Sequence, residues 1–137
     1  IKLKCFLKTS GGKGLHVVLP IAPTPWERAK TFAKTVAEAM EADQPDRYVA
    51  TATKAKRNKR IFIDYLRNSR EATAVAPYST RARPGAAVSV PIDWSELSGL
   101  KSASQYTVQN LIQRMSRLRK DPWANIGREK QQLPKFR

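Results

Sequence analysis

The sequence predicts a mixed α/β (α+β) domain in which helices flank a mostly antiparallel sheet. Three observations lead to this fold class: apolar runs are short, glycine- or proline-containing turns separate them, and only two segments show helical spacing of apolar residues. The chain has 137 residues, of which 41% are hydrophobic. This composition is sufficient for a hydrophobic core, and the length corresponds to one domain at most.

The first elements follow from apolar patterning. Apolar runs over residues 3–7 and 15–19 predict two strands, joined by a turn at residues 10–16 that we call the glycine loop. Residues 24–27 have the pattern of a capping box with proline at the first helical position. Helical spacing then predicts a helix over about 25–42 with a core-facing stripe of Ala29, Phe32, Ala33, Val36, Ala37 and Met40.

The middle of the chain predicts further short strands. Residues 48–53 alternate weakly, 54–60 form a basic turn, and the branched and aromatic residues of 61–66 favour a strand. Another short strand is expected over 73–78. The following segment, residues 79–85, contains proline and glycine and should reverse the chain.

The last third predicts mainly helix. Residues 93–96 open a short helical turn, and apolar residues recur over 108–118 as in a helix of about twelve residues, which Pro122 stops. Residues 124–137 are polar and basic, so we expect a tail or linker there and a domain over 1–123.

Charge indicates the class of partner. Lysine and arginine outnumber aspartate and glutamate by 26 to 11, giving a net charge of +15, which is typical of a nucleic-acid-binding protein. Residues 47–70 carry eight basic side chains against one acid, and 101–137 carry nine against two. For the tail from Arg114 to Arg137, a solvated surface and contact with DNA are equal alternatives. A membrane surface is the competing partner, but no segment resembles a transmembrane helix or a signal peptide. Cys5 is the only cysteine, which excludes an internal disulfide and indicates a reduced cytoplasmic protein.

The glycine loop is the strongest functional signal. Three glycines allow a tight turn that brings backbone N–H groups close to an anion, and Ser10, Lys13 and His16 add a hydroxyl, an ammonium and an imidazole. The loop has neither the Walker spacing nor the dinucleotide-binding spacing. The alternatives are a simple connecting loop and, for His16, a structural core histidine.

Further downstream, Asp64 interrupts an otherwise apolar segment. A carboxylate in a strand is costly unless it is paired or bound to metal, so a salt bridge to Arg67 or Arg70 and a metal-ligand role are the two interpretations. Arg81 and Arg83 are two residues apart, and in an extended segment both would point to one face, where they could grip phosphate oxygens.

Together these motifs resemble a known family. The segments TSGGKGLH at 9–16, IFIDYLRN at 61–68 and TAVAPYSTRARPGA at 73–86, followed by Pro91, Trp94, Glu96, Leu97 and DPW at 121–123, look like the polymerase domain of bacterial DNA ligase D. That family belongs to the archaeo-eukaryotic primase superfamily. It adds nucleotides at broken DNA ends in non-homologous end joining, so the resemblance implies a nucleotidyltransferase of DNA double-strand break repair.

The resemblance also implies roles for residues. Ser10, Lys13 and His16 match the motif that holds the triphosphate of the incoming nucleotide, and Arg67, Arg81 and Arg83 would line the same pocket. Asp64 matches a catalytic carboxylate that helps to bind manganese or magnesium. Such a set is coherent for phosphoryl transfer, since cations and hydrogen-bond donors neutralise the charge of the transferred phosphate.

One family motif has no counterpart. The family carries an Asp-x-Asp pair upstream of the glycine loop, and no Asp-x-Asp occurs in this sequence. We therefore expect the C-terminal part of a domain, with an exposed apolar face and no primer extension by this polypeptide alone, its metal ligands being completed by residues outside it. The alternative is a non-catalytic basic module that binds nucleic acid or nucleotide.

The resemblance finally implies partners and location. DNA ends and nucleoside triphosphates are the expected ligands, and ligase and nuclease modules and the Ku end-binding protein are partners by family resemblance. The expected location is the bacterial cytoplasm at the nucleoid, with no membrane association.

Overall fold

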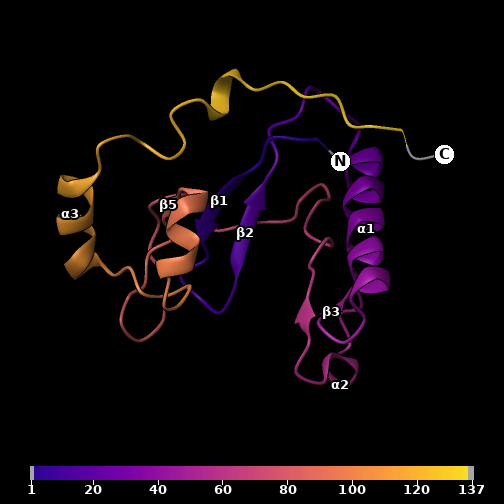
Figure 1. Cartoon of the computed structure of the whole chain (residues 1–137), viewed down its shortest axis with the longest axis horizontal. Coiled ribbons are helices and arrows are strands. Elements are labelled where there is room, and N and C mark those ends of the chain that lie inside the picture. The colour runs from indigo at the N-terminus through magenta and orange to yellow at the C-terminus, as the bar shows by residue number, and fades with distance from the viewer. Residues whose placement is uncertain (1, 136–137) are drawn as a thin grey trace. The chain divides into compact units, whose positions relative to one another are not determined.

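The computed structural model describes residues 2–135 and divides the chain into two compact units (Figure 1). The sheet unit comprises Ile1–Ala22 and Val75–Gln132, and the helix unit comprises Pro23–Ala74 and Leu133–Arg137. Helices and an antiparallel sheet are both present, which confirms the predicted fold class.

Three strands form the antiparallel sheet of the sheet unit, in the order β2-β1-β5 (Figure 1). Strand β1 spans Phe6–Thr9 and β2 spans Leu15–Val18, so the first strand begins three residues later than predicted and the second matches its prediction closely. Strand β5, Pro91–Ile92, was not predicted. Its proline is accommodated because β5 lies at the edge of the sheet.

A buried threonine connects β1 to the segment before β5. The Thr9 N–H donates to the Val90 carbonyl at 2.9 Å, and the Thr9 hydroxyl donates to the Val88 carbonyl at 3.2 Å. The Thr9 hydroxyl oxygen also accepts from the Val90 N–H at 2.9 Å, and the Ser89 hydroxyl donates to the Thr9 carbonyl at 2.7 Å. All four residues are buried, so this polar cluster lies inside the core, where paired groups avoid the cost of desolvation.

The helical turn after Asp93 and the helix over about 108–118 agree with the sequence prediction, whereas the helical segment at Ile126–Arg128 lies where a tail or linker was expected. The 3-10 helix η1 spans Trp94–Gly99, helix α3 spans Val108–Arg117, and a short 3-10 helix η2 spans Ile126–Arg128. Both η1 and α3 begin with a capping box, which satisfies N–H groups that the helix itself leaves unpaired. Part of the apolar stripe of α3 is exposed, with Ile112 at 77%, while Leu111 is half-buried.

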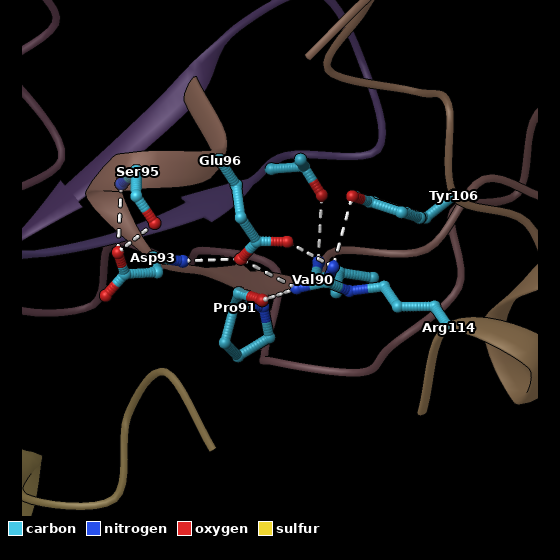
Figure 2. A network of polar contacts seen from close by, with 8 residues as sticks. Val90, Pro91, Asp93, Ser95, Glu96, Tyr106 and Arg114 are labelled. Carbon is cyan, nitrogen blue, oxygen red and sulfur yellow. Dashed lines mark hydrogen bonds and ion pairs between the residues drawn. The ribbon is translucent and has the colours of Figure 1, made fainter. Parts of the chain in front are cut away.

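An ion pair holds α3 against η1 (Figure 2). The Arg114 guanidinium pairs with both carboxylate oxygens of Glu96, donates to the Pro91 carbonyl at 3.0 Å and lies over the ring of Tyr106. Burial by itself would raise the pKa of Glu96, but the hydrogen bonds from Arg114 and from the Asp93 N–H, with the charge of Arg114, lower that pKa overall. This contact joins three segments of the sheet unit.

Helix α1, Trp26–Asp43, dominates the helix unit and confirms the predicted helix. Pro25, predicted as the first helical residue, instead occupies the N-cap position, so α1 begins one residue later than the predicted helix. Of the predicted stripe only Ala37 is fully buried, while the other five residues are half-buried, so the stripe is less enclosed than predicted.

Short elements complete the helix unit. Strands β3, Tyr48–Val49, and β4, Ile61–Phe62, pair in parallel, and the basic turn contains the one-turn helix α2, Lys54–Arg57. Strand β4 ends four residues earlier than predicted. This brevity matters for the site, because Asp64 lies beyond the strand.

Two other predictions concern the ends of the sheet unit. The strand predicted over 73–78 is absent, and that segment instead attaches through single bonds such as Tyr78 N–H to the Ser89 carbonyl at 2.6 Å. In the C-terminal segment of the sheet unit, the Gln131 side chain donates to the Lys4 and Pro20 carbonyls. Leu133, which follows in the helix unit, is buried. Phe136 and Arg137 of the predicted tail lie outside the described residues. Among residues 2–135, no helix combines the length and apolar character needed to cross a membrane.

Candidate functional site

The glycine loop is a closed turn held by one bond within its backbone, by the Ser10 hydroxyl oxygen and by the Ala103 carbonyl. Ser10 N–H donates to the Gly14 carbonyl at 3.1 Å, Gly12 N–H donates to the Ser10 hydroxyl oxygen at 3.1 Å, and Gly11 N–H donates to the Ala103 carbonyl at 3.0 Å. The expectation that the glycine N–H groups face an anion is therefore wrong for Gly11 and Gly12. These bonds fix the shape of the loop, while the Lys13 side chain stays exposed.

The arginines of residues 79–85 lie next to this loop. A Cβ added at Gly11 would lie 2.8 Å from the Cγ of Arg81, and one added at Gly12 would lie 3.6 Å from the Nη1 of Arg83. The Arg83 N–H donates to the Arg81 carbonyl at 2.8 Å and closes a tight turn, in agreement with the chain reversal predicted for residues 79–85, so the two arginines do not lie in an extended segment. The turn nevertheless brings both arginines to the glycine loop, each beside a different glycine.

Three cations around the loop have no acidic partner. Among residues 2–135, the side chains of Lys13, Arg81 and Arg83 make no hydrogen bond or ion pair, whereas Arg114 in the same unit pairs with Glu96 and donates to the Pro91 carbonyl. Unpaired cations that surround a rigid loop attract a polyanion, because no internal carboxylate competes for them.

Strand register adds a lysine that the sequence analysis did not identify. Lys8 is the direct cross-strand partner of His16, so the two side chains share one face of the sheet. Lys8 is buried, its ammonium donates to the Val75 carbonyl, and burial lowers its pKa. The sequence does contain a signal for this residue, because Lys8 follows the apolar residues Phe6 and Leu7 and lies two residues before Ser10.

Asp64 and Arg67 belong to the helix unit. One Asp64 oxygen accepts from the Leu66 N–H at 3.0 Å, and the other lies 3.8 Å from the Nε of Arg67. The Nη1 of Arg67 donates to the Thr73 carbonyl at 3.0 Å. The salt-bridge interpretation of Asp64 is thus present in the structure. Contrary to prediction, the Asp64 carboxylate has no burial cost to offset, since it is exposed at the turn after β4.

The donor set of the described residues does not make a complete metal centre. No group of three or more histidine, cysteine, aspartate or glutamate side chains within residues 2–135 is arranged to hold an ion. Asp64 offers one exposed carboxylate, while divalent cations such as magnesium take about six ligands, usually with several from water or phosphate. Asp64 by itself therefore does not define a site.

Comparison with known proteins decides the family. Residues 1–123 match the model of the family described as "LigD, primase-polymerase domain". The chain belongs to the LigD primase-polymerase family. It is 42% identical over 133 residues to the multifunctional non-homologous end joining protein LigD of Pseudomonas aeruginosa, covering 96% of this chain and 16% of that protein.

More distant LigD proteins agree. Identity to the multifunctional non-homologous end joining DNA repair protein LigD of Mycobacterium tuberculosis is 36% over 118 residues, covering 85% of this chain and 15% of that protein. Identity to the bifunctional non-homologous end joining protein LigD of Bacillus subtilis is 26% over 112 residues, covering 80% and 18%. The chain thus spans less than a fifth of the length of these relatives.

A solved structure gives the same result for the fold. The polymerase domain from Mycobacterium tuberculosis Ligase D, in complex with DNA, superposes with a TM-score of 0.83 and 32% sequence identity. The match covers 94% of this chain and 45% of that chain. This LigD family member therefore shares both sequence and fold with part of a polymerase domain.

Proposed function

We propose that this LigD family chain binds the triphosphate of a nucleotide and serves nucleotidyl transfer at DNA ends in non-homologous end joining. The observation that carries the proposal is the placement of Arg81 and Arg83 beside Gly11 and Gly12, with Lys13 on the same loop. The names of the relatives, which are end-joining proteins, and the DNA in the solved complex support the reaction class.

The chemistry assigned to the sheet unit is anion binding. Lys13, Arg81 and Arg83 would bind phosphate oxygens by charge-assisted hydrogen bonds, and the Ser10 hydroxyl, which already accepts from Gly12 N–H, could donate its proton to another oxygen. His16 would add an imidazole from β2 on the face that Lys8 shares. Positive charge there would stabilise the pyrophosphate leaving group.

Two residues of the helix unit have separate proposed roles. Asp64 would give one carboxylate to manganese or magnesium, with the remaining ligands from outside the described residues, and Arg67 would bind a nucleotide phosphate. Their present pairing at 3.8 Å is an exposed ion pair, which is worth little and is readily exchanged for a ligand. DNA ends, ligase and nuclease modules and Ku remain the proposed partners.

Nucleotide binding by the sheet unit can be tested directly. We expect Arg81→Gln and Arg83→Gln each to weaken binding of a nucleoside triphosphate about tenfold or more, because a hydrogen bond to a charged group is worth about 1.5 to 3 kcal/mol. The measurement is titration calorimetry without metal at low salt. Lys120→Gln is the control, since it removes one positive charge from an exposed site after α3. Equal affinity in the wild type and both arginine variants would refute the assignment.

The second candidate, a binding module without catalysis, is favoured by the same unpaired cations, which bind anions without any metal. The two candidates differ in metal dependence. Manganese should strengthen triphosphate binding by the wild type and not by Asp64→Ala if Asp64 is a ligand. An identical response of both proteins would support the binding module alone.

A further inference from the structure

The helix unit contains a pocket that the proposed triphosphate site does not use. It has a volume of about 350 Å³ and is lined by Trp26, Glu27, Lys30, Ser69 and Arg70. All five residues belong to the helix unit, so the pocket is formed within one compact body. We infer that this pocket binds one unpaired nucleotide of a nucleic-acid strand, with the base stacked on Trp26 and its phosphate held by Lys30 and Arg70.

Trp26 supplies the stacking surface. Its side chain is 52% exposed at the first turn of α1, and among residues 2–135 its indole N–H has no hydrogen-bond partner. By contrast, the indole N–H of Trp94 donates to the Cys5 carbonyl at 2.9 Å, and that of Trp123 donates to the Leu7 carbonyl at 2.8 Å. Trp26 therefore presents a flat aromatic face and a free donor, which suits a nucleobase.

Two unpaired cations border the tryptophan. Lys30 follows Trp26 by four residues, which places both side chains on the same face of α1. Arg70 comes from the turn after Asp64. Within residues 2–135, neither Lys30 nor Arg70 makes a hydrogen bond or an ion pair through its side chain, although Lys34, one turn further along α1, pairs with Glu38.

The turn that carries Arg70 is itself well bonded. Asn68 N–H donates to the Tyr65 carbonyl at 3.2 Å, Ala72 N–H donates to the Ser69 carbonyl at 3.1 Å, and the Ser69 hydroxyl donates to the Leu66 carbonyl at 3.1 Å. The backbone position of Arg70 is thus fixed while its guanidinium stays available. A fixed backbone lowers the entropic cost of engaging a ligand.

The third charged group selects the ligand class. Glu27 also lines the pocket, and its carboxylate would repel a bare phosphate ion that filled the whole space. A nucleotide satisfies both requirements, because the base offers N–H donors to a carboxylate while its phosphate can lie beside the two cations. A strand is favoured over a free nucleotide by the surrounding charge, since residues 47–70 of the same unit carry eight basic side chains and one acid.

A double-mutant cycle isolates the stacking contact. Fluorescence anisotropy compares binding of a labelled single strand of about eight nucleotides with that of an abasic strand of equal length and charge. These titrations use the full chain in chelator without triphosphate, so the result does not depend on the triphosphate site. We expect Trp26→Ala to lower the affinity for the base-bearing strand about 5- to 150-fold and to leave the affinity for the abasic strand unchanged. Trp26→Phe should retain most of the affinity for the base-bearing strand.

Matched controls test the assignment of each group. Trp94→Ala removes another exposed tryptophan and should leave the difference between the two strands intact. Lys30→Gln and Arg70→Gln should each reduce by about 0.7 the magnitude of the slope of log binding constant against log salt concentration, whereas Lys34→Gln should not. The inference is overturned if Trp26→Ala weakens both strands equally or neither, or if Lys34→Gln acts like Lys30→Gln. It is also overturned if a free mononucleotide binds as tightly as the strand.

Discussion

Replacing Gly11 with alanine tests whether the glycine loop and the neighbouring arginine turn form one rigid unit. Gly11 has φ +64°, which lies in the left-handed region, and the added Cβ would lie 2.8 Å from the Arg81 Cγ and 3.0 Å from the Ala87 carbonyl oxygen. The first contact involves an atom near the base of the arginine side chain, and the second involves backbone. The backbone oxygen cannot move away without a shift of the chain, and the Cγ can move only if the Arg81 side chain rotates about its Cα–Cβ bond.

The expected cost has two parts. A left-handed backbone costs a non-glycine residue about 1 to 2 kcal/mol. Overpacking of a dense site costs about 1 to 3 kcal/mol more. Gly11→Ala should therefore lower the free energy of unfolding by about 2 to 5 kcal/mol, and displacement of Arg81 should weaken triphosphate binding.

Gly12→Ala is the matched control. Its Cβ would meet only ordinary contacts, 3.4 Å from the Ser10 hydroxyl oxygen and 3.6 Å from the Arg83 Nη1, and its φ is not in the left-handed region. We expect its free energy of unfolding to stay within about 1 kcal/mol of the wild type. Urea unfolding followed by tryptophan fluorescence measures both variants. If Gly11→Ala is as stable as Gly12→Ala, the steric reasoning is wrong.

Three other predictions follow from the structure. Glu96→Gln keeps the acceptor for Asp93 N–H but removes the charge facing Arg114, so it should cost about 1 to 3 kcal/mol near neutral pH. Because the pKa of Glu96 is lowered in the fold, this difference should shrink in urea titrations as the pH falls below the ordinary range of glutamate. The free energy of unfolding of Lys8→Met should lie within about 1 kcal/mol of the wild-type value at neutral pH. Since burial lowers the pKa of Lys8, the free energy of unfolding of the wild type should rise relative to that of Lys8→Met as the pH rises towards the ordinary pKa of lysine. Urea unfolding curves at two pH values would detect this. The 137-residue polypeptide, which contains no Asp-x-Asp, should not extend a primer with nucleoside triphosphates and manganese, and measurable extension in a gel assay would contradict this.

Local patterns predicted the regular elements well. Helical spacing located α1 and α3, and the glycine turn between two apolar runs located β1 and β2, because each of these signals depends on residues close in the chain. The same holds for the glycine loop and its cationic residues. Strand β5 was not predicted, because it pairs with a strand about eighty residues earlier in the chain and because its proline argues against a strand.

The side-chain environment could not be predicted in the same way. The burial assumed for Asp64 required a strand that continues past Phe62, and pairing of β3 with β4 stops earlier. The two glycine N–H groups were assigned to an anion, yet the Ala103 carbonyl and the Ser10 hydroxyl oxygen occupy them. Such outcomes depend on distant partners, which periodicity does not reveal.

The close contact between Gly11 and the Arg81 side chain has an evolutionary consequence. A larger side chain at one of these two positions requires a compensating change at the other, so substitutions at positions 11 and 81 should covary among related sequences. Because internal bonds already occupy the N–H groups of Gly11 and Gly12, altered ligand preference should arise mainly through exchange of single side chains on a conserved backbone.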